Sequence, residues 1–223
     1  MARLPFITFE GSEGCGKSTQ VRRLAARLEK AAVPVLVTRE PGGTEIGESI
    51  RELLQFAPES AAMMAETELL LFEASRAQLV REVIKPALAR GDCVIADRFF
   101  DSTTVYQGAA RKLDSQIVKQ LNSFAIGDCV PDITFVLDVD LTTARSRMKG
   151  PRRPDRMEME SDDFYEKVIE GYRQLAKQES KRVTLIDGTK SVDSIDTEIW
   201  NILSARFSAL AGKSEIGNRK SKI

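Results

Sequence analysis

Short apolar runs alternate with segments whose apolar residues are spaced three and four apart. The apolar runs cover residues 6–10, 33–38, 93–97, 133–139 and 183–187, and near-continuous runs of this kind predict buried strands. The intervening spacing predicts helices. Strands that alternate with helices form a parallel sheet with helices on both faces. We therefore predict an α/β, doubly wound parallel sheet of about five strands flanked by helices.

The helical pattern covers residues 17–31, 45–55, 65–89, 114–126, 163–181 and 192–210. Within the third of these segments, Leu69, Phe72, Arg76, Leu79 and Val83 share one stripe. Phe72 and Arg76 can offer a ring for stacking and a planar donor for a base edge. The alternative, which periodicity alone favours, is a core Phe beside an Arg whose stem lies along apolar surface.

In the segment 114–126 we expect three apolar side chains to pack inward: Ile117, Leu121 and Phe124.

A chain of 223 residues is long enough for one α/β domain with a full core. We expect residues 1–211 to form this single domain. Residues 212–223 are small, polar and basic, and we expect them to be a disordered tail.

Composition excludes several classes of protein. Lys plus Arg and Asp plus Glu both number 33, so no basic field indicates nucleic acid as a partner. Three scattered cysteines and no histidine exclude a disulfide framework, a structural zinc site and a His-based triad. No apolar run reaches membrane-spanning length, and we expect a soluble protein of the reducing cytoplasm.

A glycine-rich turn follows the first predicted strand and opens a helix. Gly11, Gly16, Lys17 and Ser18 fit G-x-x-x-x-G-K-[ST], whose backbone N–H groups converge on phosphate at a helix N-terminus. Lys17 is expected to reach the β- and γ-phosphates and Ser18 to hold Mg²⁺. The residues expected to bind ATP here are Gly11, Ser12, Glu13, Gly14, Cys15, Gly16, Lys17, Ser18 and Thr19.

Further candidates lie at the carboxyl ends of other strands, where open α/β sheets bind ligands. Asp97 ends the third apolar run and is expected to organise Mg²⁺. Arg39 precedes Glu-Pro-Gly-Gly-Thr and is a candidate anion ligand. The alternative, on equal terms, is that Pro-Gly-Gly forms an ordinary tight turn and that the Arg39 side chain is exposed to solvent beside it. We interpret the polar segment 99–111 as a substrate wall, and Asp140 as a helix cap.

Residues 144–163 combine a cluster of basic side chains with Gly and Pro, and we expect them to form a mobile lid. The basic residues are Arg145, Arg147, Lys149, Arg152, Arg153 and Arg156. A closing lid excludes water and brings guanidinium groups to a phosphoryl transition state. The alternative is an ordinary solvated surface.

Taken together, these segments resemble the bacterial thymidylate kinase family from the first strand to about residue 200. The resemblance is carried by Gly-Ser-Glu-Gly-Cys-Gly-Lys-Ser, Thr-Arg-Glu-Pro-Gly-Gly-Thr, Ser-Arg-Ala-Gln-Leu-Val, Asp-Arg-Phe and Ser-Thr-Thr-Val-Tyr-Gln-Gly in the family's order. It implies a P-loop nucleoside monophosphate kinase that transfers the γ-phosphoryl group of MgATP to dTMP, giving dTDP for dTTP synthesis. It also implies a homodimer.

The resemblance assigns roles to individual residues. The dTMP-binding set it implies is Glu13, Arg39, Phe72, Arg76, Arg98, Ser102, Tyr106 and Gln107. Within this set, Glu13 contacts the 3′-hydroxyl, Phe72 stacks on thymine and Arg76 donates to its edge, which reverses the preference from periodicity. Arg98 holds the phosphate, as does Arg39. Tyr106 crowds the 2′ position.

The glycine-rich loop carries Glu13 and no arginine, as in the family type whose lid supplies the catalytic arginine. We expect that role for Arg153, with Lys17, Asp97 and Arg98 completing the catalytic set, and we expect Arg147 to pack on adenine. Two alternatives remain. One is another P-loop small-molecule kinase, such as a deoxynucleoside kinase. The other is a nucleotide-dependent binding module, although no Asn-Lys-x-Asp guanine-reading motif is present.

Overall fold

The computed structural model describes residues 3–148 and 155–210. Five strands form one parallel sheet in the order β2-β3-β1-β4-β5, which confirms the predicted fold class. The strands are β1 (Phe6–Glu10), β2 (Val35–Arg39), β3 (Cys93–Asp97), β4 (Ile133–Asp138) and β5 (Val183–Asp187). β1 lies between β3 and β4, so the turn after it opens at the middle of the sheet.

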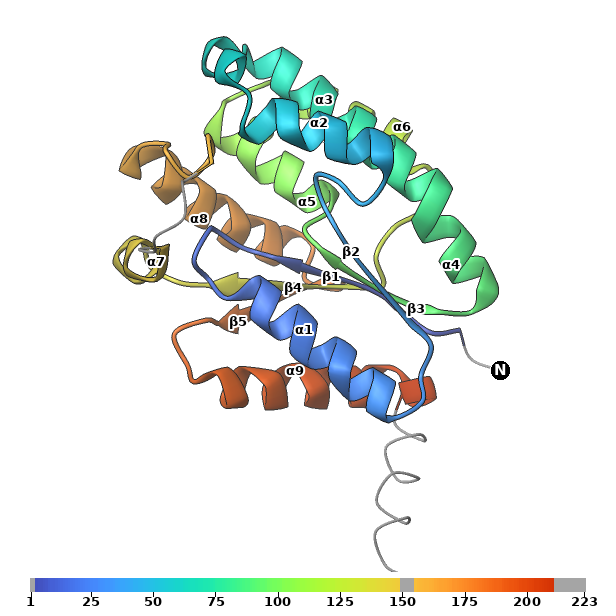
Figure 1. The fold of residues 1–223 in the computed structure, drawn as a ribbon. Coiled ribbons are helices and arrows are strands. Elements are labelled where there is room, and N and C mark those ends of the chain that lie inside the picture. The colour runs from blue at the N-terminus through green and yellow to red at the C-terminus, as the bar shows by residue number, and fades with distance from the viewer. Residues whose placement is uncertain (1–2, 149–154, 211–223) are drawn as a thin grey trace, which may run out of the picture.

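Helices cover both faces of the sheet (Figure 1). One face carries α1 (Lys17–Lys30) and α9 (Val192–Arg206), which pack on each other. The other layer comprises α2 (Glu45–Gln55), α3 (Ala65–Leu79), α4 (Lys85–Arg90), α5 (Phe100–Thr103), α6 (Ser115–Ile126) and α8 (Asp162–Gln178). α7 (Leu141–Met148) follows β4. A short 3₁₀ helix, η1 (Pro58–Ala62), joins α2 to α3.

The third predicted helix is continuous but changes its winding twice. π-helical turns follow α3 at η2 (Val80–Ile84) and α5 at η3 (Thr104–Ala110). Such turns inside α-helices frequently lie at functional sites. The η3 turn carries Tyr106 and Gln107, two of the predicted site residues.

Two expectations about burial are wrong. β2 is an edge strand, and 45% of the Val37 side chain is exposed, so helices do not enclose it on both faces. In α6, Ile117 and Phe124 are 53% and 77% exposed. The buried face of α6 instead carries Val118 and Asn122. Because Asn122 is polar, the spacing of apolar residues alone does not identify this face as the buried one.

A buried ion pair joins α5 to Arg182, the residue that precedes the edge strand β5. Asp101 is fully buried and accepts Arg182 Nη1 at 2.6 Å and Nη2 at 2.9 Å. Its Oδ2 also lies 3.2 Å from Thr134 Oγ1 on β4. Because both guanidinium donors point at one carboxylate, loss of that carboxylate leaves a half-enclosed cation without its partner.

Asp101→Asn should lower the free energy of unfolding by about 3 kcal/mol, since breaking a buried pair from one side leaves uncompensated charge. Urea unfolding at pH 7 measures it. Asp163→Asn, which breaks the exposed pair with Lys167 on α8, should change stability very little. Equal losses of stability from the two substitutions would contradict the stabilising role given to the buried pair of Asp101 and Arg182.

Candidate functional site

A cleft of about 1000 Å³ runs along the carboxyl ends of the strands. The glycine-rich loop forms its floor, and α2, α3, η3 and the two flanks of residues 149–154 contribute its walls. The predicted residues that line it are Glu13, Gly14, Cys15, Gly16, Lys17, Ser18, Thr19, Arg39, Phe72, Asp97, Arg98, Ser102, Tyr106, Gln107 and Arg147. The structure therefore gathers most of the sequence candidates in one place.

The loop between β1 and α1 requires glycine for steric reasons. At Gly11, φ is +132° and a Cβ would lie 2.6 Å from Leu137 O. At Gly14, φ is +73° and a Cβ would lie 2.4 Å from Ala144 O. Only a residue without a side chain fits both places. The loop thus lies directly against the end of β4 and against α7.

Lys17 begins α1 and reaches back over this loop. Its side chain is buried, and Nζ donates to Gly11 O at 3.1 Å and to Ser12 O at 2.8 Å. Gly11 and Ser12 do not line the cleft themselves, but they hold the ammonium group at its floor. The loop and the first turn of α1 together form a positively charged cradle that suits phosphate.

Ser18 and Asp97 meet beside the cradle. Ser18 Oγ donates to Asp97 Oδ2 at 2.5 Å, although 79 residues separate them in the chain. In the described ranges, no three His, Cys, Asp or Glu side chains cluster as a metal site. A hydroxyl and one carboxylate nevertheless fit Mg²⁺, because this ion keeps several waters and takes its remaining oxygens from phosphates.

Arg98 is the most densely bonded cation at the cleft. It adopts a left-handed backbone conformation, with φ 71°, directly after β3. Its guanidinium donates to Gly11 O, Glu13 Oε1, Ser102 Oγ, Tyr106 OH and Tyr172 OH. Burial opposes its charge, but the nearby Glu13, Tyr106, Tyr172 and Glu10 together outweigh this and keep the pKa of Arg98 well above its usual value. A permanently charged, rigid fork at this point is suited to an anionic group.

Two residues that support this arginine were missed by sequence reasoning. Glu10 is fully buried and accepts Tyr172 Oη at 2.8 Å, Ser102 Oγ at 2.6 Å and Phe99 N at 2.7 Å. Burial, reinforced by the charge of Asp101, raises the pKa of Glu10. A carboxylate at the end of an apolar strand was the available clue to Glu10, whereas Tyr172 lies in α8 without any motif.

Phe72 and Arg76 lie one turn apart on α3 but differ in their surroundings. Phe72 is half-buried and lines the cleft, as predicted. Arg76 is 1% exposed and is not among the lining residues. Its five N–H groups all have acceptors: two reach Glu40 Oε2, and the others reach Glu73, Asn122 and Phe99 O. Donation from Arg76 to a base edge stays a prediction.

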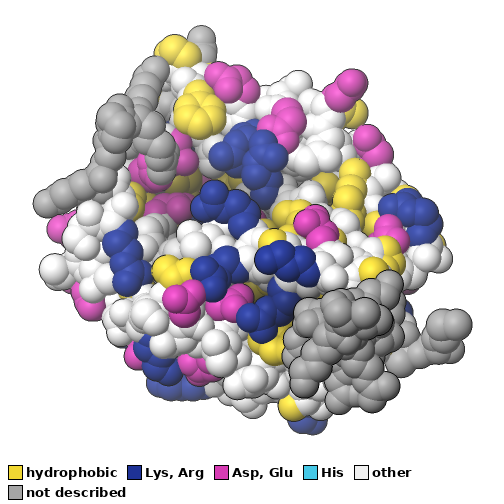
Figure 2. Space-filling model, turned by 60° about the horizontal axis from the view of Figure 1, so that its bottom comes forward, with side chains coloured by type: hydrophobic (Ala, Val, Ile, Leu, Met, Phe, Trp, Pro, Cys, Tyr) yellow, Lys and Arg dark blue, Asp and Glu magenta, His cyan; other side chains and the backbone are white. Residues whose placement is uncertain are grey.

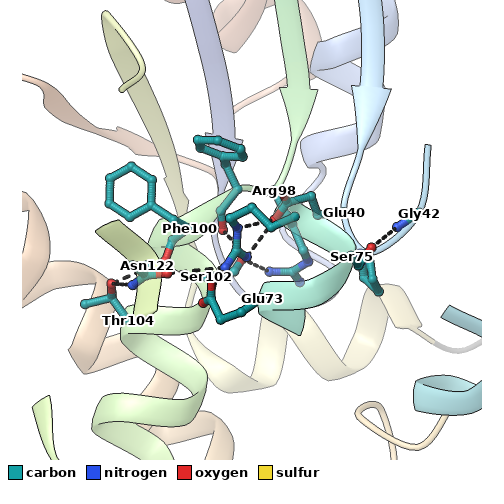
Figure 3. A network of polar contacts seen from close by, with 12 residues as sticks. Glu40, Gly42, Glu73, Ser75, Arg98, Phe100, Ser102, Thr104 and Asn122 are labelled. Carbon is teal, nitrogen blue, oxygen red and sulfur yellow. Dashed lines mark hydrogen bonds and ion pairs between the residues drawn. The ribbon is translucent and has the colours of Figure 1, made fainter. Parts of the chain in front are cut away.

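Figure 3 shows the cluster around this guanidinium, with Glu40, Glu73 and Asn122 converging from separate segments. One cation faces two carboxylates, and among the described residues neither Glu40 Oε1 nor Glu73 Oε2 has a hydrogen-bond partner. Burial raises the pKa of Glu40 to about 7, and the charge of Arg76 only partly offsets this effect. The cluster therefore takes up a proton near neutral pH.

This pKa sets a pH dependence of stability. The folded state binds a proton on Glu40 up to pH about 7, whereas the unfolded chain releases it near 4.5, so the contribution of Glu40 to stability falls as pH rises between these values and is constant above. We expect the difference in the free energy of unfolding between the wild type and Glu40→Gln, measured by denaturant titration, to change between pH 5 and 7 and to be constant above pH 7. A difference independent of pH would contradict the shift.

Arg39 lines the cleft but is half-exposed and pairs with Glu48 Oε2 at 2.8 Å. Beside it lies Arg51, a lining residue that sequence reasoning missed because it occupies an ordinary helical position in α2. Arg51 donates to Pro41 O at 3.1 Å. Burial and the adjacent charge of Arg39 lower the pKa of Arg51. The two like charges would be relieved by an anion in the cleft.

The opposite end of the cleft is formed by the turn after β5. Gly188, Lys190 and Val192 line it together with Arg147, which donates from Nη1 to Gly188 O at 2.8 Å. A Cβ on Gly188 would lie 3.4 Å from Cys15 O, so this turn abuts the glycine-rich loop. Residues 187–189 therefore lie beside the loop.

The predicted catalytic Arg153, like Arg152, lies outside the described residues. The flanks of the lid are described, and their arginines have partners. Arg145 donates to Asp162 and to two backbone carbonyls, and Arg156 bonds Leu54 O and Glu68. Asp140 accepts Thr143 N at 2.7 Å, which confirms its interpretation as a helix cap.

On the face drawn in Figure 2, Lys and Arg side chains are interspersed with Asp and Glu. The mixed charges agree with the balanced composition. No helix within the described ranges is both long and apolar enough to cross a membrane.

Comparisons with known proteins agree on one family. The family model described as thymidylate kinase matches residues 9–199. A thymidylate kinase of Fervidobacterium nodosum is 48% identical over 90% of this chain and 98% of its own length, and one of Geobacter sulfurreducens is 48% identical over 90% and 97%. The crystal structure of thymidylate kinase from Ehrlichia chaffeensis superimposes with a TM-score of 0.75 at 35% identity, covering 91% of this chain and 99% of that chain.

Proposed function

The chain belongs to the thymidylate kinase family, and we propose that its cleft holds ATP and dTMP end to end for transfer of the γ-phosphoryl group. The enzyme is an ATP-dependent nucleoside monophosphate kinase that converts dTMP to dTDP. One observation carries the arrangement of the site. The phosphate cradle around Lys17 and the anion-binding fork of Arg98 open into the same cleft, on two adjacent strand ends.

ATP occupies the end formed by the glycine-rich loop and the turn after β5. The loop amides and Lys17 bind its phosphates, and Arg147, held by Gly188 O, packs on adenine. Ser18 and Asp97 would hold Mg²⁺. When bound, this ion draws charge from the β- and γ-phosphate oxygens.

The monophosphate occupies the end formed by α3 and η3. Arg98, joined by Arg39 and Arg51, binds its phosphate, and Glu13 reaches the 3′-hydroxyl. Phe72 supplies a ring for stacking on the base. On the opposite wall, Ser102, Tyr106 and Gln107 face the nucleoside, and Tyr106 restricts the 2′ position.

Phosphoryl transfer in this site requires no protein nucleophile. The acceptor phosphate oxygen attacks directly, so the residues act by aligning two anions and balancing the charge that spreads over the transferring group. The contacts of Lys17 and Arg98 with the glycine-rich loop support this role. We propose that Arg153 of the lid joins them when residues 144–163 close and exclude water.

A coupled assay of ADP formation with a panel of acceptors tests the proposal. Turnover with dTMP, weaker turnover with dUMP and none with thymidine are expected. Phosphorylation of thymidine but not dTMP would identify a deoxynucleoside kinase instead. ADP production that does not depend on any acceptor would indicate a nucleotide-dependent module.

We also propose a homodimer, supported by apolar side chains exposed on neighbouring helices. They are Ile46, Leu53, Leu70, Ile117 and Phe124, with exposures of 41–77%, on α2, α3 and α6. α3 packs against both other helices, so these residues lie on adjoining elements. Large apolar groups exposed on adjoining helices indicate a protein interface.

Sedimentation velocity should give twice the 24.8 kDa chain mass. Phe124→Asp should shift this species to the monomer, because it places a charge among the exposed apolar groups. A monomer in the unmodified protein would contradict the proposed dimer.

A further inference from the structure

Glu68 on α3 is a buried carboxylate to which the proposed mechanism gives no role. Its side chain is 1% exposed. It accepts Gln107 Nε2 at 2.8 Å, Arg111 Nε at 3.2 Å and Arg111 Nη2 at 3.0 Å, and it also accepts Arg156 Nη2. These partners come from η3, the turn after it and the lid flank, so one carboxylate joins three segments around the monophosphate end of the cleft.

The two arginines keep this carboxylate ionised. Burial by itself raises the pKa of Glu68, but the hydrogen bonds from Arg111 and Gln107, with the charges of Arg111 and Arg156, outweigh it, so the pKa lies below its usual value. An ionised carboxylate can only accept hydrogen bonds. The amide of Gln107 must therefore present its nitrogen, and not its oxygen, to Glu68.

This constraint decides what Gln107 presents to the cleft. Gln107 lines the cleft, and in the described part of the chain Nε2 is the only atom of its side chain that forms a hydrogen bond. The remaining polar atom is the acceptor Oε1. Phe72 lies one helical turn beyond Glu68 on α3 and lines the same cleft, which places the amide beside the ring that is proposed to stack on the base.

We propose that Glu68 is a positioning residue that fixes the orientation of the Gln107 amide, so that Oε1 selects a base with a hydrogen-bond donor at N3. Thymine and uracil carry N3–H, whereas N3 of cytosine is an acceptor. A fixed acceptor facing another acceptor leaves two buried lone pairs opposed and unpaired, and such mismatches reject ligands strongly. This inference rests on the proposed binding of dTMP at this end.

Glu68→Gln tests the orientation directly. An amide at position 68 can donate as well as accept, so Gln107 is free to turn and offer Nε2 to cytosine. The ratio of kcat/KM for dTMP to that for dCMP should fall about tenfold or more. The ratio for dTMP to dUMP should stay unchanged, because both bases carry N3–H. A purely structural role would lower all three activities together.

Three further variants complete the test. Glu68→Asp retains an acceptor-only group and should keep the dTMP to dCMP ratio. Glu160→Gln removes the negative charge that lies 2.5 Å from Arg111 but leaves the contact between Glu68 and Gln107 in place, and should also keep the ratio. In a Gln107→Leu background, Glu68→Gln should have no further effect on it. Equal ratios in Glu68→Gln and the wild type would overturn the proposal.

If Glu68→Gln does not fold, NMR of the wild-type protein tests the orientation of the Gln107 amide instead. The side-chain amide protons of Gln107, identified by their loss in Gln107→Leu, should be protected from solvent exchange with and without dTMP. Loss of their protection when dTMP binds would overturn the proposal. A wild type that does not phosphorylate dTMP would instead refute the proposed function on which the inference rests.

Discussion

Lys17→Ala should lower kcat by about 10³-fold while dTMP binding changes little, because the ammonium group contributes mainly when charge builds on the transferring phosphoryl group. Nζ lies at the floor of the loop, 2.8 Å from Ser12 O, and its ion pair with Glu13 at the monophosphate end is long, at 3.8 Å, whereas Glu13 contacts Arg98 at 2.5 Å. The coupled ADP assay measures kcat, and calorimetric titration with dTMP measures binding.

Lys167→Ala is the matched control for this change. Lys167 is partly exposed on α8 and, among the residues that the structure describes, pairs only with Asp163 one turn away, so activity should be that of the wild type. If Lys17→Ala retained more than about a tenth of wild-type kcat, the role of the loop as a γ-phosphate site would be wrong.

Arg98→Lys should reduce kcat/KM for dTMP by about 10³-fold, although it conserves the charge. The guanidinium uses its fork to contact the loop carbonyl, Glu13 and the hydroxyls of Ser102, Tyr106 and Tyr172 together. A lysine ammonium has three donors and cannot reproduce this geometry. The KM for ATP should change far less, since the loss falls on the acceptor end.

Arg23→Lys provides the control, because Arg23 pairs with exposed Asp193 on the α1–α9 face and does not line the cleft. Its kinetic constants should match those of the wild type. If Arg98→Lys raised the KM values of both substrates equally, Arg98 would hold the cleft together rather than bind the monophosphate.

The fold was predictable because its pattern is local. Apolar runs and helical spacing located all five strands, and the motif formed by Gly11, Gly16, Lys17 and Ser18 identified the phosphate loop. The same reasoning failed where burial depends on neighbours. The run that forms β2 looks fully enclosed, yet its place at the edge of the sheet leaves Val37 exposed. In α6, Asn122 faces inward because it contacts Arg76 and Thr104.

The residues of the site likewise fall into two groups, those that the sequence identified and those that only the tertiary structure brought to light. Lys17, Ser18, Asp97 and Arg98 were found because each follows a strand or opens a helix, where a motif of contiguous residues fixes its place. Sequence reasoning assigned no role to Arg51, Tyr172 and Glu10. Only the packing of the chain brings Arg51 to the cleft and joins Tyr172 to Glu10 beneath it. Phe72 and Arg76 share one helix face, but the carboxylates of Glu40 and Glu73 keep Arg76 behind the wall.

The sequence by itself determined the order of elements, the phosphate loop and the residues at strand ends, because these depend on side chains close together in the chain. The tertiary structure alone decided which buried charges meet. Glu68 receives Gln107, Arg111 and Arg156 from positions 39, 43 and 88 residues away. Such encounters are set by how helices pack on the sheet, and neither periodicity nor spacing along the chain encodes that packing.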